Sequence, residues 1–293
     1  MGLLDALNDL DKQAEPRGRD EILRAPFAYP GGKSRSVESI LPRLPYTDVY
    51  IEPFGGSAAV LLSRRSSKFE VFNDRYAGVV AFYRCMQHAD KLAALLKRLE
   101  LTVHAREEFV YAKANWQKVE DDVERAALWY YMSTFSFASL GRNFGRSTSA
   151  KSPMSEKIRN KLVYFQKIHE RFRGVQVENQ DWYACMQDYD QPNAVFYCDP
   201  PYVDAHRGTF KYEMSLDEHR QFLDFVFSCK GFVAVSGYEN PLYDNQKWDS
   251  RHEWDSFVSI RPAAFTDGNY KKHLKDVDKR EHAIEVLWIK EAK

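Results

Sequence analysis

Short apolar runs separated by polar segments occupy both ends of the chain. Each run is rich in β-branched and aromatic residues and is bounded by turn residues, which is typical of a buried strand. Strands are predicted at 48–52, 69–73, 175–178, 194–198, 232–236, 251–260 and 283–289. Helices with one apolar side are predicted at 57–65 and 217–227. The alternation of strands and helices predicts an α/β sheet domain.

The middle of the chain follows a different pattern. From residue 76 to about 173, apolar residues recur three and four positions apart, and no strand-like alternation interrupts them. The clearest repeats are Val79, Phe82, Tyr83 and Met86, then Leu92, Leu95, Leu96 and Leu99. This stretch predicts a helical lobe inserted into the sheet domain. We therefore divide the chain into an N-terminal extension at 1–24, a sheet domain at 25–75 and 175–293, and a helical lobe at 76–174.

The strand predicted at 194–198 ends in the tetrad Asp199, Pro200, Pro201 and Tyr202. Open α/β sheets bind their ligands at the carboxyl ends of such strands. An ionised aspartate only accepts hydrogen bonds and proline has no backbone N–H, so the turn offers acceptors on a stiff frame. A planar NH2 group beside the Tyr202 ring fits it, either an exocyclic amine of a base or a side-chain amide. The alternative is a capped turn after a core strand.

A strand, a glycine loop and a helix at 48–65 form the first unit of a nucleotide-binding sheet. Asp74 follows Gly55 by 19 residues, close to the spacing at which such folds place an acid on ribose hydroxyls. The full GxGxxG fingerprint is absent, which favours a nucleoside-bearing ligand without a diphosphate. A helix is predicted after the segment Gly31, Gly32 and Lys33, with Ser34 or Ser36 as its cap. The segment itself is either an anion-binding site or an ordinary turn.

The charge of the whole chain balances, with 42 Lys and Arg against 42 Asp and Glu. Residues 139–173, however, hold nine basic residues against two acidic ones. The loop at the start of this run is rich in glycine, serine and arginine, a composition that suits contact with a phosphate backbone and with bases in a groove. The alternative is a solvated charged face. The candidate nucleic-acid contacts are Arg142, Asn143, Phe144, Arg146 and Lys151.

Several classes of site are not indicated. The cysteines at 85, 185, 198 and 229 form no CxxC pair, so neither a zinc site nor a disulfide framework is predicted, and no metal is expected. No apolar run approaches the roughly 20 residues that span a bilayer. The first 24 residues carry acidic side chains and no apolar segment like that of a signal peptide. A cytoplasmic protein without a membrane contact is expected.

Five segments in one order carry a family resemblance: 27–33, 52–56, 73–74, 181–182 and 199–202. Together they resemble the Dam-like DNA adenine N6-methyltransferases of the D12 class, and the resemblance covers roughly residues 25–290. It implies a Rossmann-like sheet that binds S-adenosylmethionine, with an inserted helical target-recognition lobe. It also implies methyl transfer to N6 of an adenine that is flipped out of duplex DNA.

The resemblance assigns roles to individual residues. The catalytic residues would be Asp199, Pro200, Pro201 and Tyr202, which hold the amine and stack on the base. Asp74 would bind the cofactor ribose, Asp181 its adenine, and Tyr29 and Lys33 its methionine end. The full set of implied cofactor residues is Tyr29, Gly32, Lys33, Glu52, Phe54, Gly56, Asp74, Asp181 and Trp182. The chain departs from the family at Ala58, where a glycine is often found.

Other readings remain at this point. Cytosine N4 also presents an amine, and so do RNA bases and protein glutamine; a DNA-binding relative that has lost catalysis is a further alternative. Serine often replaces the aspartate in enzymes for cytosine N4, and asparagine in those for glutamine. A monomer or a weak dimer is expected, without an obligate protein partner. The loop at 141–149 is shorter than the hairpin of family members that read GATC, so the recognition sequence is not predicted.

Overall fold

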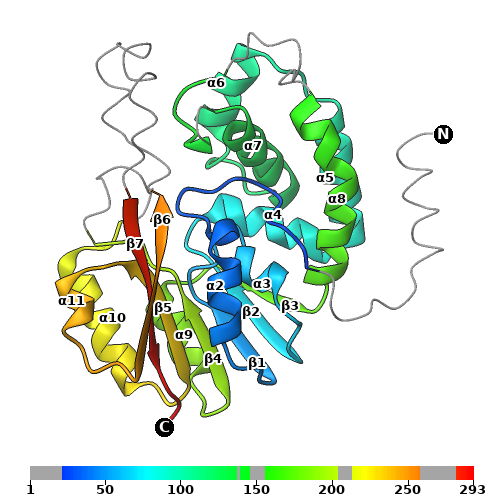
Figure 1. The fold of residues 1–293 in the computed structure, drawn as a ribbon. Helices are drawn as coiled ribbons and strands as arrows, with labels where there is room; N and C mark the ends of the chain where they lie inside the picture. Colours follow the sequence, from blue (N-terminus) through cyan, green and yellow to red (C-terminus); the bar gives the residue numbers. More distant parts are fainter. Residues whose placement is uncertain (1–21, 137–138, 146–155, 204–212, 258–281) are drawn as a thin grey trace, which may run out of the picture.

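The computed structural model describes residues 22–136, 139–145, 156–203, 213–257 and 282–293. A seven-stranded sheet runs through it in the order β3-β2-β1-β4-β5-β7-β6 (Figure 1). Its strands are β1 (Val49–Glu52), β2 (Phe69–Asn73), β3 (Val175–Glu178), β4 (Ala194–Cys198), β5 (Phe232–Tyr238), β6 (Ser250–Phe257) and β7 (His282–Lys290). The first five strands pair in parallel, whereas β7 is antiparallel to both β5 and β6. The predicted α/β class is confirmed.

Helices cover both faces of the sheet because every strand sends alternate side chains to opposite sides. In β1, Tyr50 packs with one core cluster and Ile51 with the other. The first face is covered by α2 (Val37–Ile40), α3 (Ala59–Ser63), α4 (Ala77–Gln87) and α8 (Glu156–Phe172). The opposite face is covered by α9 (Trp182–Tyr189), α10 (Leu216–Ser228) and α11 (Pro241–Asp244). The strands in the middle are therefore buried along nearly their whole length, and most of their residues are apolar.

The order of strands reverses between β1 and β4. The chain leaves β1 toward β2 and β3 on one side, and leaves β4 toward β5 on the other. Adjacent parallel strands that lead to opposite sides leave a crevice outside their carboxyl ends, where ligands bind in open α/β sheets. Glu52 ends β1 and Asp199 follows β4, so the sheet brings two predicted site residues to this crevice.

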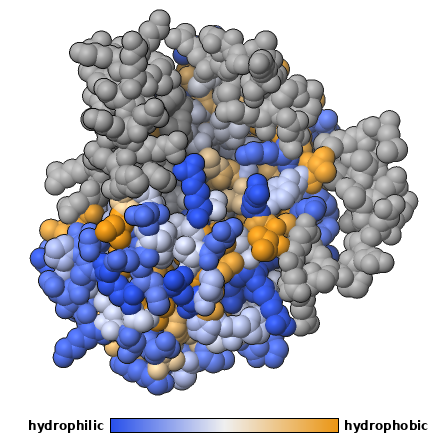
Figure 2. Space-filling view, viewed as in Figure 1, coloured by the Kyte–Doolittle hydropathy of each residue, from blue (hydrophilic) through white to orange (hydrophobic). Residues whose placement is uncertain are grey.

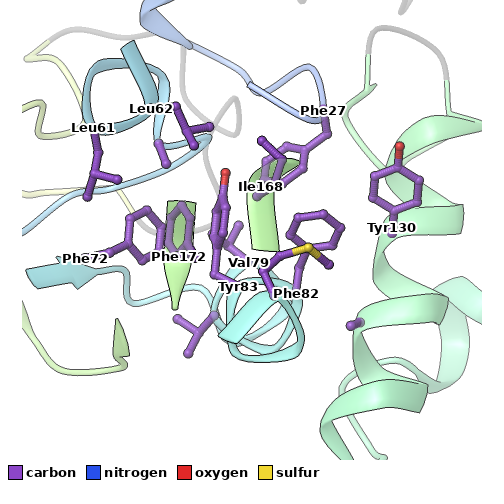
Figure 3. Close-up of a cluster of buried hydrophobic side chains, with 14 of the residues drawn as sticks. Phe27, Leu61, Leu62, Phe72, Val79, Phe82, Tyr83, Tyr130, Ile168 and Phe172 are labelled. Carbon is purple, nitrogen blue, oxygen red and sulfur yellow. The ribbon is translucent and has the colours of Figure 1, made fainter. Parts of the chain in front are cut away.

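The helices that the structure describes between β2 and β3 are α4, α5 (Ala89–Glu100), α6 (Arg106–Asn115), α7 (Asp122–Thr134) and α8. Their apolar side chains share one hydrophobic core with the sheet, and Figure 3 shows the part of this core around α4 and α8. Phe72 of β2 contacts Tyr83 of α4, and the Tyr83 ring stacks on Phe172 of α8 at 4.3 Å between centroids. The division at 75 and 76 remains a proposal, because the packing is continuous across it. Helices α4 and α8 belong to the lobe in sequence and to the cover of the sheet in space.

Two predicted boundaries differ from the structure. Residues 22–24 were assigned to the extension, but Leu23 is 1% exposed and its N–H donates to Leu62 at 3.1 Å. The core therefore begins before residue 25, while residues 1–21 lie outside the described part. The helix predicted at 57–65 is shorter, because Ala58 has a left-handed backbone with φ of 54° and only α3 follows it.

The described surface of the sheet domain is mostly hydrophilic on the face that Figure 2 shows, and hydrophobic residues form small separate patches there. In the ranges that the structure describes, no helix is long and apolar enough to cross a membrane.

Candidate active site

A cavity of about 390 Å³ opens at the carboxyl ends of β1 and β4. Its volume falls within the roughly 300–1,000 Å³ of small-molecule sites. The wall combines the segment at 29–33, the loop at 52–57, the tetrad and the end of α7. Among the predicted catalytic and cofactor residues it includes Tyr29, Gly32, Lys33, Glu52, Phe54, Gly56, Asp74, Trp182, Asp199, Pro200, Pro201 and Tyr202. Asp181 does not line it.

Asp199 is held by two donors that come from distant parts of the chain. Lys33 Nζ lies 2.6 Å from Asp199 Oδ2, and Ser236 Oγ donates to Asp199 Oδ1 at 2.9 Å. Burial raises the pKa of Asp199, and the Lys33 ammonium opposes this increase. These bonds fix the plane of the carboxylate, and each oxygen keeps a second lone pair with which to accept another hydrogen bond.

The Tyr202 ring forms a side of the same cavity. It makes an edge contact with Tyr238 at 4.6 Å between centroids, and Lys33 Nζ lies 4.9 Å from its centre. The hydroxyl of Tyr202 donates to Glu285 of β7. Neither Glu285 nor Ser236 was a predicted site residue. Glu285 carried a signal, since it is a carboxylate in the middle of the apolar run Ala-Ile-Glu-Val-Leu at 283–287.

The glycine loop after β1 is shaped by close packing. A Cβ on Gly55 would lie 2.1 Å from the Phe72 ring, so a larger residue would push the loop off β2. Gly56 has φ of +51° and Ala58 has φ of 54°, both in the left-handed region that favours glycine. The family resemblance expected a glycine at Ala58, and the structure gives the physical reason.

Asp74 organises this loop. Its Oδ2 accepts from the Gly56 N–H at 2.8 Å and its Oδ1 from the Tyr76 N–H at 2.6 Å. Burial raises the pKa of Asp74 to about 6, and the two backbone donors oppose this increase. Asp181 instead caps α9 by accepting from the Tyr183 N–H, and its other oxygen lies 3.6 Å from Arg75.

Gln180, which sequence reasoning passed over, does line the cavity. Its Oε1 is buried and has no hydrogen-bond partner within the described ranges. A buried acceptor of this kind normally has a partner, which a bound ligand can supply. The residue directly before Asp181 is therefore a candidate contact for the adenine end of a nucleoside ligand.

Glu52 lies at the cavity floor and is 2% exposed. The Tyr50 hydroxyl donates to its Oε1 at 2.7 Å. Burial raises the pKa of Glu52 from its ordinary value of 4.5 to about 8, while the bond from Tyr50 and the charge of Arg64 oppose this increase. At neutral pH the carboxyl group is therefore mostly protonated.

This pKa predicts a pH-dependent effect of Glu52→Gln on stability. Unfolded Glu52 loses its proton near pH 4.5 and folded Glu52 near pH 8, so wild-type stability falls as the pH rises between these values. The variant, which keeps the neutral shape, lacks this loss and should be more stable at pH 9 by on the order of a few kcal/mol. At pH 4.5 the two should be similar. Urea unfolding at pH 4.5, 7 and 9 measures the difference.

The exposed Glu38 of α2 provides the control, since Glu38→Gln removes a carboxylate outside the cavity. A constant difference between wild type and Glu52→Gln at all three pH values would contradict the raised pKa.

The loop after α7 brings the helical lobe to the cavity. Ser139, Leu140 and Gly141 line the wall, and the exposed Arg142 and Asn143 follow directly. The loop is pinned by Lys113, which donates to the Arg142 carbonyl at 2.7 Å, and by Gly145, whose N–H donates to the Phe135 carbonyl at 2.6 Å. Two predicted DNA contacts thus stand at the rim of the site.

The other predicted DNA contacts have different positions. Phe144 packs inside the lobe, where its ring stacks on His104 at 4.7 Å between centroids and Arg106 lies over it. Its aromatic ring stabilises the loop and is only partly exposed. Arg146 and Lys151 lie outside the described residues.

Arg171, one of the nine basic residues at 139–173, is not placed to contact a phosphate backbone. It is 8% exposed and forms a two-pronged ion pair with Glu70 of β2. Lys161 donates to the Pro26 carbonyl at 3.0 Å, which ties α8 to the N-terminal segment. A count of charges along the sequence could not separate these structural cations from exposed ones.

Residues 29–260 match the sequence model of the family described as D12 class N6 adenine-specific DNA methyltransferase. The chain belongs to this family. The D12 assignment agrees with the α/β sheet and with the position of the tetrad beside β1 and β4. In the part of the chain that the structure describes, no group of three or more His, Cys, Asp or Glu residues is placed to hold a metal ion.

Curated relatives of this D12 chain are distant. It is 26% identical over 252 residues to the type II methyltransferase M.FokI of Planomicrobium okeanokoites, a match that covers 76% of this chain and 38% of the relative. It is 23% identical over 197 residues to the DNA adenine methylase of Escherichia coli K12, covering 61% of this chain and 65% of that protein. The type II methyltransferase M.CviBI of a Paramecium bursaria Chlorella virus is 23% identical over 228 residues, with 74% and 85% covered. The chain thus spans less than two thirds of the first two relatives.

Proposed function

We propose that this protein is a site-specific methyltransferase that transfers a methyl group from S-adenosylmethionine to N6 of an adenine flipped out of duplex DNA. The observation that carries the proposal is the position of Asp199, whose oriented carboxylate lines the same cavity as the glycine loop and Asp74. Family membership and the basic loop at the rim support it.

The hydrogen-bond acceptors of the cavity and the space beside its glycine loop support the proposed cofactor. Asp74 can accept hydroxyl hydrogen bonds beyond those from Gly56 and Tyr76, as a ribose requires. Gly56 leaves room beside the Tyr29 ring, where a Cβ would lie within 3.2 Å of ring atoms. When bound, the cofactor would supply an electrophilic methyl group on a sulfonium centre.

Asp199 and Pro200 would act on the adenine itself. The Asp199 carboxylate and the Pro200 carbonyl would accept hydrogen bonds from the two amine hydrogens, which would raise electron density on N6 and direct its lone pair toward the methyl donor. As the bond from N6 to the methyl carbon forms, the carbon–sulfur bond of the donor would break to leave a neutral thioether, and N6 would give up one proton toward the Asp199 carboxylate. Tyr202 stacks on the base and recovers part of the few kcal/mol that base flipping costs. Positioning and fixed charges account for the rate, so no covalent enzyme intermediate is needed.

The helical lobe would hold the duplex. Arg142 and Asn143 leave the cavity wall at the point where a flipped base would enter, and their side chains suit guanine and adenine edges in the major groove. We propose that this protein acts as a monomer on double-stranded DNA.

Mapping of methylated bases tests the proposal. Duplex DNA is incubated with the protein and S-adenosylmethionine, digested to nucleosides and analysed by mass spectrometry, and the modified positions are sequenced. N6-methyladenine at one short recurring sequence is expected. N4-methylcytosine would favour the cytosine alternative, and no modified base despite cofactor binding would favour a catalytically silent DNA-binding protein.

A further inference from the structure

Glu285, a carboxylate in the last strand, contacts both the tetrad, at Tyr202, and the segment that contains Lys33 and Ser36. Glu285 is 4% exposed although it lies within the apolar sequence of β7. Its Oε2 accepts from Ser36 Oγ at 2.9 Å. Its Oε1 accepts from the Tyr202 hydroxyl at 3.0 Å and lies 3.6 Å from Lys33 Nζ. A buried carboxylate needs such partners, and each of them belongs to or adjoins the site.

Lys33 stands between two carboxylates. It is 5% exposed, and its Nζ contacts Asp199 Oδ2 at 2.6 Å and the Gly31 carbonyl at 2.7 Å as well as Glu285. A buried ammonium is costly without a negative partner. If Asp199 were the sole counter-ion, the attraction of Lys33 would compete with the target amine for the same oxygen. Glu285 supplies the second negative charge.

Glu285 also determines where the Tyr202 ring stands. Pro200 and Pro201 restrict the backbone that leads to Tyr202, but its ring can still rotate about its side-chain bonds. The bond to Glu285 at one end and the edge contact with Tyr238 hold the ring at the cavity wall. Because β7 pairs with β5 along six residues, the anchor belongs to the rigid sheet.

We propose that Glu285 is a positioning residue for methyl transfer. It holds the Tyr202 ring through the phenol hydroxyl and shares the charge of Lys33, so that Asp199 can accept the target amine. This inference rests on the proposed function and goes beyond it, because Glu285 acts through Lys33 and Tyr202 and belongs to neither the tetrad nor the glycine loop.

Glu285→Gln keeps the size of the side chain and removes its charge. The single-turnover rate of methyl transfer should fall about 10- to 100-fold, a typical range for a group that positions others. The dissociation constant of S-adenosylmethionine, measured by titration calorimetry, should stay within about three-fold, because the glycine loop and Asp74 are untouched. Glu285→Asp, which keeps the charge, should be less impaired than Glu285→Gln.

Glu253→Gln is the matched control. Glu253 lies on the neighbouring β6, opposite Val286 in register, and is 55% exposed in an ion pair with Arg251. This variant should have the wild-type rate. A Glu285→Gln protein as active as the Glu253→Gln protein would overturn the inference. So would a parallel loss of cofactor affinity and thermal stability, because that pattern indicates a structural role only.

A double-mutant cycle tests the route through Tyr202. Tyr202→Phe keeps the ring and removes the hydroxyl that Glu285 accepts, so the double variant should be slower than Glu285→Gln by less than the factor found for Tyr202→Phe alone. Independent, multiplying effects would contradict the inference. A crystal structure of Glu285→Gln gives a readout without methyl transfer, in which the Tyr202 ring should leave its contact with Tyr238.

The failure of the proposed function is distinguishable from these outcomes. If wild-type protein methylates no DNA base, the proposed function fails, and the crystallographic and calorimetric results still report on Glu285. If wild-type protein methylates adenine and the variants behave like Glu253→Gln, only the inference fails.

Discussion

Asp199→Ala should lower the rate of methyl transfer by about 10³-fold, on the scale measured when an enzyme loses a charge-stabilising group at its reacting atom. The substitution removes the carboxylate that would accept an amine hydrogen of the flipped adenine. It leaves the Pro200 carbonyl and the Tyr202 ring, which accounts for some residual activity. Single-turnover kinetics on duplex DNA with labelled cofactor measures the change.

The same variant should still bind S-adenosylmethionine. Asp199 lies at the end of β4, while Asp74 and the glycine loop lie at the ends of β2 and β1. Lys33 keeps Glu285 as a negative partner 3.6 Å away, so removal of Asp199 does not leave a buried ammonium unpaired. A dissociation constant within about three-fold of wild type is expected. Near-normal methyl transfer by a protein that binds cofactor would refute the assigned role.

The strands of the sheet could be predicted from the sequence because each strand is a local run of apolar residues. The run at 194–198 is buried at every position, and so is β1, which explains why neither shows polar alternation. The helical spacing of apolar residues between 76 and 173 identified helices correctly, but this spacing does not show which element each helix packs against. That α4 and α8 share one core with β2 follows from contacts such as Phe72 with Phe172, which are far apart in sequence.

The missing parts of the site depend on long-range topology. Glu285 meets Tyr202 only because β7 inserts between β5 and β6, and no local pattern predicts that strand order. The weak sequence signal for Glu285 was a charged residue inside an apolar strand. Such a departure from the apolar pattern of a buried strand marks a functional position. Ser36 illustrates the same limit. It was predicted as a helix cap, yet its side chain makes no capping bond and reaches Glu285.

The count of basic residues was the least specific sequence signal for contacts with DNA. Arg142 and Arg171 count equally in the basic run at 139–173, yet Arg142 is exposed at the cavity rim and Arg171 is buried against Glu70. Under the proposed function, the basic residues of the lobe therefore divide into exposed ones that would meet the duplex and buried ones that hold the lobe on the sheet. The second group should affect stability more than the salt dependence of DNA binding.

Glu70→Ala should lower the free energy of unfolding by about 3–5 kcal/mol, the usual effect of removing one partner from a buried ion pair. Glu70 is 3% exposed on β2 and pairs with both Arg64, at 3.1 Å, and Arg171. Its loss leaves two buried guanidinium groups without their carboxylate. Because Arg171 lies at the end of α8, the pair also fastens the helical lobe to the sheet. Urea unfolding followed by circular dichroism measures the difference.

Lys68 offers a control two residues away on the same segment. Its ammonium is 78% exposed and pairs with a half-exposed Asp48 at 2.7 Å, so Lys68→Ala should leave the free energy of unfolding nearly unchanged. Both ion pairs have short contacts. A comparison of the two variants therefore shows whether burial, and not the presence of an ion pair alone, determines the loss of stability. Equal effects of Glu70→Ala and Lys68→Ala would mean that the Glu70 pairs do not stabilise the fold, and that aromatic packing such as Tyr83 on Phe172 alone holds α8 against the sheet.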